Sequence, residues 1–139
     1  TLGWAVNHAV GSRRYRVQVQ TEGGHSFGSF GNRNAIQVLS QMIVNLYQMQ
    51  VPDKAKTTYN VGTIQGGTSV NTIAQEAAML FEYRSEDREC LDVMEQQFRT
   101  IVEETRPLCQ SLSVELLGER PLPGRNSPFR RVLPTAIHF

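Results

Sequence analysis

The sequence predicts an α+β fold of the ferredoxin-like type: a four-stranded antiparallel sheet with two helices on one face, in the order βαββαβ. Three observations predict it. Four segments alternate apolar and polar residues as strands do, two segments repeat apolar residues with a helical period, and Gly, Pro or a capping residue stands at the junctions. Right-handed crossovers then place both helices on the same face of the sheet. The 139 residues fit one domain, which we expect over residues 11–119.

The first strand is expected over residues 14–20, where apolar and polar side chains alternate. Residues 23–31 are rich in glycine and are expected to form a loop. A helix follows, because six apolar residues recur on one helical face: Ala35, Val38, Leu39, Met42, Ile43 and Leu46. Asn32 or Asn34 can cap its N-terminus, since a short amide side chain accepts hydrogen bonds from the free N–H groups there.

Two further strands are expected in the middle of the chain. Residues 57–65 are rich in Thr, Tyr, Val and Ile, which favour strands. A turn at residues 66–69 connects this strand to a third one over residues 74–84, and the two are expected to form a hairpin. The first residues of the third segment have helical propensity, but its alternation continues to the end and favours a strand.

Ser85 or Asp87 is expected to cap the second helix, whose apolar face consists of Leu91, Met94, Phe98, Ile101 and Val102. Pro107 ends this helix, and the fourth strand follows where Leu112, Val114 and Leu116 alternate with polar residues. Residues 120–139 contain four of the six prolines and show no period, so we expect an irregular tail or part of a neighbouring domain. The chain opens on Thr1 rather than Met, which also indicates a piece of a longer protein.

Composition argues against several classes of protein. With 40% hydrophobic and 19% charged residues, the chain is not expected to be disordered. The net charge of +1 argues against a nucleic-acid partner, and no segment approaches the roughly 20 apolar residues that cross a bilayer. Helix-like sequence separates Cys90 from Cys109 by more than the roughly 7 Å that a disulfide permits between Cα atoms. Free thiols and a reducing, cytoplasmic compartment are therefore expected.

A metal site is not predicted within this chain. The three histidines, His8, His25 and His138, are isolated in sequence, and no spacing typical of zinc ligands occurs. There is no phosphate-binding glycine loop and no nucleophile elbow. Glu103 and Glu104 are interpreted as a solvated helix face, because no histidine or metal ligand is nearby in sequence. We expect neither a bound cofactor nor catalysis by this chain alone.

Three polar residues beside glycine loops or strand ends are candidates for ligand contacts. His25 lies in the first glycine-rich loop, where the backbone can approach a ligand closely, and its imidazole can both donate and accept hydrogen bonds. Asn71 follows the second glycine turn, and Arg84 ends the third strand. Each also has an ordinary structural interpretation: an idle loop histidine, turn chemistry for Asn71, and an ion pair with Glu82 or Glu86 for Arg84.

Four short motifs occur in order: Gly-Gly-His-Ser at residues 23–26, Asn-Ala-Ile at 34–36, Gly-Gly-Thr-Ser-Val-Asn-Thr-Ile at 66–73 and Glu-Tyr-Arg at 82–84. With these motifs the chain resembles the dimerisation, or lid, domain of the zinc-dependent aminoacylase and carboxypeptidase family. That family includes acetylornithine deacetylase, succinyl-diaminopimelate desuccinylase and the peptidase T group. The resemblance extends over roughly residues 11–104.

The resemblance implies a role within a larger enzyme that cleaves a peptide or an N-acyl amino acid. A separate catalytic domain would hold zinc and the catalytic base. Residues 120–139 would be part of the segment through which the chain leads back into that domain. His25 would be the catalytic residue of the present domain. It would reach across a homodimer to stabilise the tetrahedral oxyanion or the substrate carboxylate. Asn71, Gly67 and Arg84 would bind substrate, with Arg84 at the carboxylate end.

A homodimer is expected through a sheet edge and the first helix, because an open sheet leaves unpaired backbone groups at its edges. The alternative function is a non-enzymatic ferredoxin-like module for small-molecule regulation or assembly, which would have no need of His25 and Arg84 together. An RNA-recognition module is a third interpretation, and only Tyr15 between Arg14 and Arg16 favours it.

Overall fold

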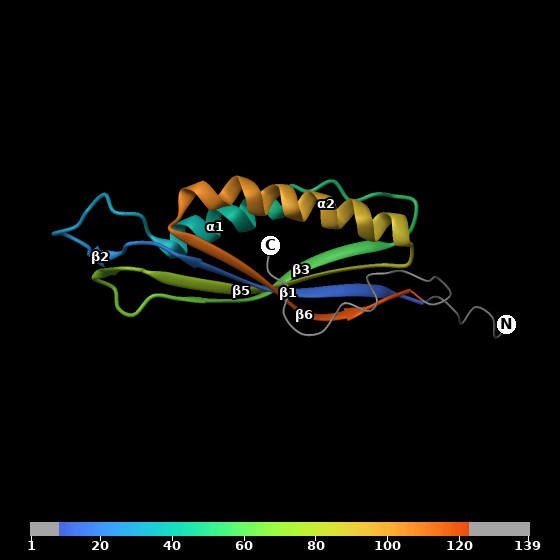
Figure 1. The fold of residues 1–139 in the computed structure, drawn as a ribbon, viewed down its shortest axis with the longest axis horizontal. Coiled ribbons are helices and arrows are strands. Elements are labelled where there is room, and N and C mark those ends of the chain that lie inside the picture. The colour runs from blue at the N-terminus through green and yellow to red at the C-terminus, as the bar shows by residue number, and fades with distance from the viewer. Residues whose placement is uncertain (1–8, 123–139) are drawn as a thin grey trace.

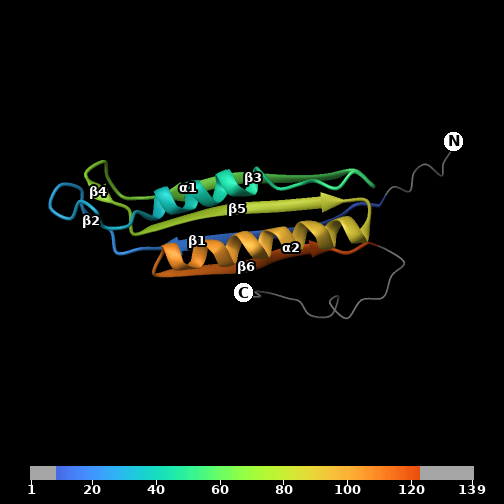
Figure 2. The same cartoon turned by 90° about the horizontal axis from the view of Figure 1, so that it is seen from above.

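Two layers, a sheet and a pair of helices, make up the computed structural model, which describes residues 9–122 (Figures 1 and 2). The sheet consists of four ten-residue strands, β1 (Gly11–Gln20), β3 (Thr57–Gly66), β5 (Glu76–Ser85) and β6 (Ser111–Arg120). Their order is β3-β5-β1-β6, and every neighbouring pair is antiparallel. The helices α1 (Ala35–Leu46) and α2 (Arg88–Thr105) cover one face. The ferredoxin-like α+β class is confirmed.

The remaining elements are short. A 3₁₀ turn, η2 (Arg106–Leu108), connects α2 to β6 and contains Pro107. The two-residue strands β2 (Gly24–His25) and β4 (Thr72–Ile73) pair with each other outside the main sheet. Residues 123–139 of the expected tail lie outside the described part of the chain, and so do His8 and His138.

The hydrophobic core lies between the sheet and the helices. The strand residues that point toward the helices are the apolar members of each alternating pattern, and Val17, Val19 and Val114 are wholly buried. Rings from three elements meet at the centre, where the Phe98 centroid lies 4.8 Å from that of Tyr15 and 5.0 Å from that of Phe81. Burial of apolar surface drives folding, so a chain with this core has the means to fold by itself.

Each helix begins where a capping side chain accepts backbone hydrogen bonds. The Asn34 side chain accepts from the N–H groups of Ile36 and Gln37 in the first turn of α1, and Asp87 accepts from the N–H of Cys90 at the start of α2. The sequence left two candidates open for each cap. Asn32 instead donates to the Gly23 carbonyl at 2.8 Å, and Ser85 accepts from the Asp87 N–H at 3.1 Å.

Both cysteines are buried and free, as expected. The compartment inferred from them stays a prediction. Among the described residues, no helix is long and apolar enough to cross a membrane. The face of the sheet opposite the helices is lined by polar side chains from the central strands, including Arg14, Arg16 and Gln18 on β1 and Glu82 and Arg84 on β5. We call this the open face.

Candidate functional site

A small two-stranded ladder projects beyond one end of the main sheet; it carries the candidate residue His25, and Asn71 stands directly before its second strand (Figure 2). His25 pairs with Thr72 in this ladder, and the Ser26 N–H donates to the Asn71 carbonyl at 3.0 Å. The prediction of a plain loop over residues 23–31 is wrong at this point, because β2 forms within it. Gly24 has φ +131, and a Cβ there would come within 2.8 Å of the Ser29 side chain. Only glycine fits this close approach.

The loop after β2 orients the His25 imidazole. Its Nδ1 accepts the backbone N–H groups of Phe27 at 3.2 Å and Gly28 at 3.3 Å. In the neutral ring one nitrogen accepts and the other carries the proton. The two contacts to Nδ1 therefore make Nε2 the donor of neutral His25. An exposed side chain with a fixed tautomer is ready to donate one hydrogen bond to an oxygen atom of a ligand.

Hydrogen bonds fix the base of the loop that contains His25. The Ser29 N–H donates to the His25 carbonyl at 2.8 Å, which closes the turn. Glu22 accepts from the Arg33 side chain and backbone, and these hydrogen bonds lower the pKa of the Glu22 carboxyl to about 2.

Two aromatic side chains nevertheless project into solvent from this loop, Phe27 at 90% and Phe30 at 88% exposure. They were not among the residues predicted from the sequence, although apolar residues inside a glycine-rich loop are a signal for contact with another surface.

Asn71 and Gly67 belong to the neighbouring loop between β3 and β4. The Asn71 Oδ1 accepts from the Ser69 hydroxyl at 2.8 Å, so the turn chemistry considered for this residue is present. Its amide nitrogen donates to no atom within the described residues. Gly67 has φ +85, a conformation that strains any residue with a Cβ. The ladder and this loop thus bring His25, Asn71 and Gly67 to the same end of the molecule.

Arg84 lies at the opposite end of the sheet. In register it faces Ser12 on β1 and Thr58 on β3, whereas the ladder lies beyond Glu76 at the other end of β5. Arg84 lies eight positions after Glu76 along an extended strand, which corresponds to about 25 Å. The candidate residues therefore form two groups, and the structure does not bring Arg84 to His25.

Arg84 forms an ion pair with Glu82, which is the ordinary structural interpretation that the sequence offered for it. Its Nε and Nη2 donate to Glu82 at 3.2 and 3.4 Å. Glu82 also accepts from Arg14 at 3.3 Å, so one carboxylate is shared between two guanidinium groups. All three side chains lie on the open face and are partly exposed. Exposed pairs of this kind are weak, so a ligand carboxylate can compete with Glu82 for Arg84.

Within residues 9–122, no group of three or more His, Cys, Asp or Glu side chains is placed to hold a metal ion. The donor set that structural or catalytic zinc requires is therefore not assembled by this part of the chain.

The chain matches the family model described as the peptidase dimerisation domain, over residues 7–107. No curated protein matches it in sequence. Solved structures share its fold. An aminobenzoyl-glutamate utilization protein from Klebsiella pneumoniae has a TM-score of 0.78 at 19% identity, and the match covers 88% of this chain and 31% of that one.

Two other solved structures are also similar. A hydantoinase/carbamoylase family amidase from Burkholderia multivorans has a TM-score of 0.72 at 18% identity, covering 80% of this chain and 28% of that one. A tripeptidase from Staphylococcus aureus has a TM-score of 0.62 at 20% identity, covering 77% and 29%. The chain thus spans less than a third of the length of each of these proteins.

Proposed function

This chain belongs to the peptidase dimerisation domain family, and we propose that it dimerises and caps the substrate in a zinc-dependent hydrolase that cleaves the amide bond of a peptide or an N-acyl amino acid. The names of the similar solved structures, an amidase and a tripeptidase among them, support this class of reaction. The described residues offer no ligand set for zinc, so the metal would be held by another part of the parent protein. The family match favours this function over a free-standing regulatory module.

The observation that carries the proposal is the separation of the two groups of candidate residues. His25 and Asn71 lie beyond one end of the sheet, and Arg84 lies about 25 Å further along the strand direction. A dipeptide in extended form is only about 7 Å long. One copy of the domain cannot bring both groups to one small substrate. A site that uses all three residues must therefore draw them from two copies of the chain.

The surface formed by α1 and the edge strand β3 suits the contact between these copies. We call it the α1/β3 surface. Four large apolar side chains, at least 39% exposed, gather there: Ile36, Val44 and Tyr47 on or next to α1, and Ile64 on β3. The Tyr47 hydroxyl accepts the Val61 N–H at 3.0 Å, while no strand of residues 9–122 lies beside the rest of the outer edge of β3. Pairing of this edge with a second β3 would satisfy its backbone groups and bury the apolar side chains.

The chemistry of each candidate fits a role in such a shared site. The Nε2 of neutral His25 would donate to the oxyanion that develops when the amide carbonyl is attacked, and a donor fixed in advance stabilises that charge most. The free amide nitrogen of Asn71 would donate to a substrate oxygen nearby. Arg84 would pair with the substrate carboxylate, because a guanidinium donates two parallel hydrogen bonds to it.

Mixed dimers of the parent enzyme test this arrangement. In one pairing, a His25→Ala subunit is combined with an Arg84→Ala subunit. If each site takes His25 and Arg84 from different chains, one site receives both mutations and the other stays intact, so about half of the wild-type kcat/KM remains by site counting. In the second pairing, a subunit with both mutations is combined with a wild-type subunit. Each site then carries one defect, and activity falls close to that of the single mutants.

The opposite pattern, in which the doubly mutated subunit beside a wild-type one retains half of the activity, would show that each site uses a single chain. Homodimeric His25→Ala enzyme should lose about 10²-fold in kcat, as expected for an oxyanion donor. An unchanged kcat in that homodimer would remove His25 from the catalytic machinery.

A further inference from the structure

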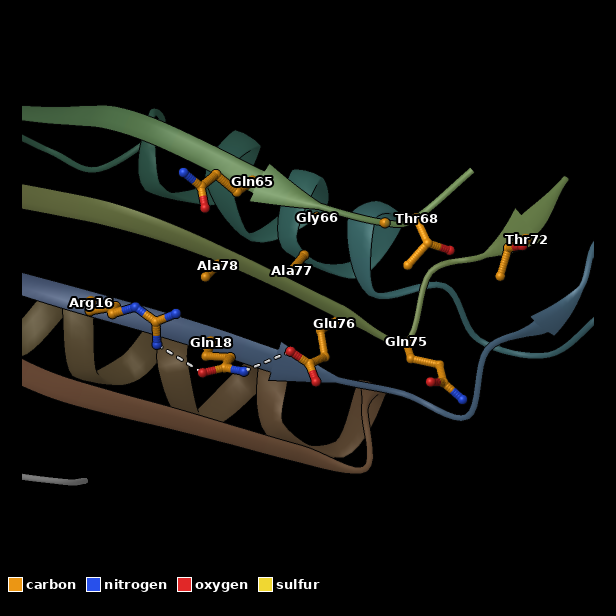
Figure 3. Close-up of a pocket in the computed structure, with 11 residues that line it drawn as sticks. Arg16, Gln18, Gln65, Gly66, Thr68, Thr72, Gln75, Glu76, Ala77 and Ala78 are labelled. Atoms are coloured by element: carbon orange, nitrogen blue, oxygen red, sulfur yellow. Dashed lines mark hydrogen bonds between the residues drawn. The ribbon is translucent and has the colours of Figure 1, made fainter. Parts of the chain in front are cut away.

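A hollow of about 420 Å³ opens on the open face of the sheet, close to the ladder (Figure 3). Ala78 lies at its floor, because this short side chain stands in the register row Gln18–Ala78–Gln65 across β1, β5 and β3. Long polar side chains on both sides of a methyl group leave space above it. We call this the Ala78 hollow. Its walls are formed by Arg16, Gln18, Gln65, Gly66, Gly67, Thr68, Thr72, Gln75 and Glu76.

The hollow contains one positive and one negative side chain held apart by an amide. Arg16 Nη1 donates to Gln18 Oε1 at 2.8 Å, and Gln18 Nε2 donates to Glu76 Oε1 at 3.2 Å (Figure 3). Within the described residues neither Arg16 nor Glu76 forms an ion pair. Because both charged groups are hydrogen-bonded to the Gln18 amide, they lie within about 8 Å of each other. Both charges are therefore available to a ligand that spans this distance.

We propose that the Ala78 hollow binds a free α-amino acid, with its carboxylate on Arg16 and its ammonium group on Glu76. The two charged groups of an α-amino acid stand on one carbon atom, and with a hydrogen bond of about 2.9 Å at each end they bridge about 8 Å. A guanidinium recognises a carboxylate through paired donors, and an ammonium group donates only, so it suits the Glu76 oxygens. The orientation of the ligand follows from the order of the two charges.

The rest of the lining indicates the kind of side chain that is bound. Gln65, Thr68, Thr72 and Gln75 are uncharged and can both donate and accept hydrogen bonds. They suit an uncharged polar side chain such as that of glutamine. The proposal concerns a binding site other than the His25 and Arg84 groups, and it does not rest on the proposed hydrolase function. It can be tested on the 139-residue chain, since the described residues bury a core of their own.

The experiment is a backbone amide NMR titration of this chain with three related probes: L-glutamine, N-acetyl-L-glutamine, which lacks the ammonium group, and L-glutaminamide, which lacks the carboxylate. L-Glutamine should shift the resonances of Arg16, Gln18, Gln65 and Ala78 in a saturable way. The other two probes should bind at least about tenfold more weakly, because each loses one charge-assisted contact. No saturable shift with up to tens of millimolar L-glutamine, or equal binding of all three probes, overturns the proposal.

Two variants locate the site. Ala78→Leu fills the hollow and should abolish the shifts, while Thr58→Leu, on the same face at the far end of β3, should leave them unchanged. Arg16→Gln keeps a polar side chain in the wall, removes the positive charge and should weaken L-glutamine binding at least about tenfold. If Ala78→Leu fails to fold, Arg16→Gln still decides the question. Wild-type affinity in Arg16→Gln would show that the carboxylate is bound elsewhere.

Discussion

The Tyr15 hydroxyl on β1 donates a hydrogen bond of 2.7 Å to Glu95 on α2, eighty positions away in the sequence. Tyr83 on β5 also donates to this carboxylate, and Arg13 lies 3.4 Å from it. Arg13 itself pairs with Glu119 on β6 at 3.0 Å. One carboxylate on the helix thus connects α2 to both central strands, at the edge of a core that is otherwise apolar.

Replacement of Glu95 should destabilise the fold. Glu95→Gln removes the charge to which two tyrosines and Arg13 are bonded, and it leaves partly buried donors with a weaker acceptor. We expect the free energy of unfolding to fall by about 1–3 kcal/mol. Urea denaturation followed by circular dichroism measures this. Glu103→Gln is the matched control, because Glu103 lies on the same helix and is 61% exposed in its pair with Arg106. An equal effect of both substitutions would contradict a special role for Glu95.

Wild type and Glu95→Gln should also differ in how their free energy of unfolding depends on pH. Burial raises the pKa of Glu95, but hydrogen bonds from Tyr83, Arg99 and Tyr15 and the charge of Arg13 outweigh it and lower the pKa overall. A carboxyl with a lowered folded-state pKa contributes stability above its ordinary pKa and loses it as the pH falls through the folded value. The stability difference between wild type and Glu95→Gln should therefore shrink below about pH 4.5. A constant difference from pH 7 to pH 2 would contradict this assignment.

The α1/β3 surface should mediate self-association of the isolated chain. Wild type should sediment with twice the monomer mass of 15.6 kDa at micromolar concentration. Val44→Lys places a charge on this surface and should yield a monomer, because a buried unpaired charge is costly. Val93→Lys changes a residue of similar exposure on α2 and should leave the dimer intact. A dimer that survives Val44→Lys but not Val93→Lys would locate the interface on the other helix.

Arg84→Ala in the parent enzyme should mainly raise KM for a substrate with a free carboxylate, by roughly tenfold or more, because this contact exists in the ground and transition states alike. Arg14→Ala is the control. Arg14 lies on the same face and shares Glu82, but it should change KM by about twofold or less because exposed pairs contribute little. Steady-state kinetics on a substrate and on its carboxamide analogue measures both. A loss confined to kcat would show that Arg84 does not bind the carboxylate.

The isolated chain should show no amidase activity and should retain no stoichiometric zinc after dialysis. The reason is the absence of a ligand group among the described residues together with the scattered positions of the histidines in the whole sequence. Metal analysis and a peptidase assay on the same sample test this. One zinc ion per chain together with turnover would refute it and would also remove the need for a separate catalytic domain.

Local pattern determined most of the architecture. The alternation in each strand and the helical period of Leu39 and Met42 depend on neighbours within a few residues, so the order of elements and the buried face of each could be predicted. In contrast, the two-residue strands of the ladder could not be predicted, because so short an element has no period to detect.

Only the tertiary structure decided how distant residues are arranged. Whether Asn71 lies beside His25, and whether Arg84 lies far from both, depends on strand pairing and register, which act across tens of residues. The Ala78 hollow likewise exists because three strands place a small side chain between two long ones. The sequence determines the chemistry of each side chain. The distances between residues far apart in sequence arise only when backbone hydrogen bonds and core packing fix the strands side by side.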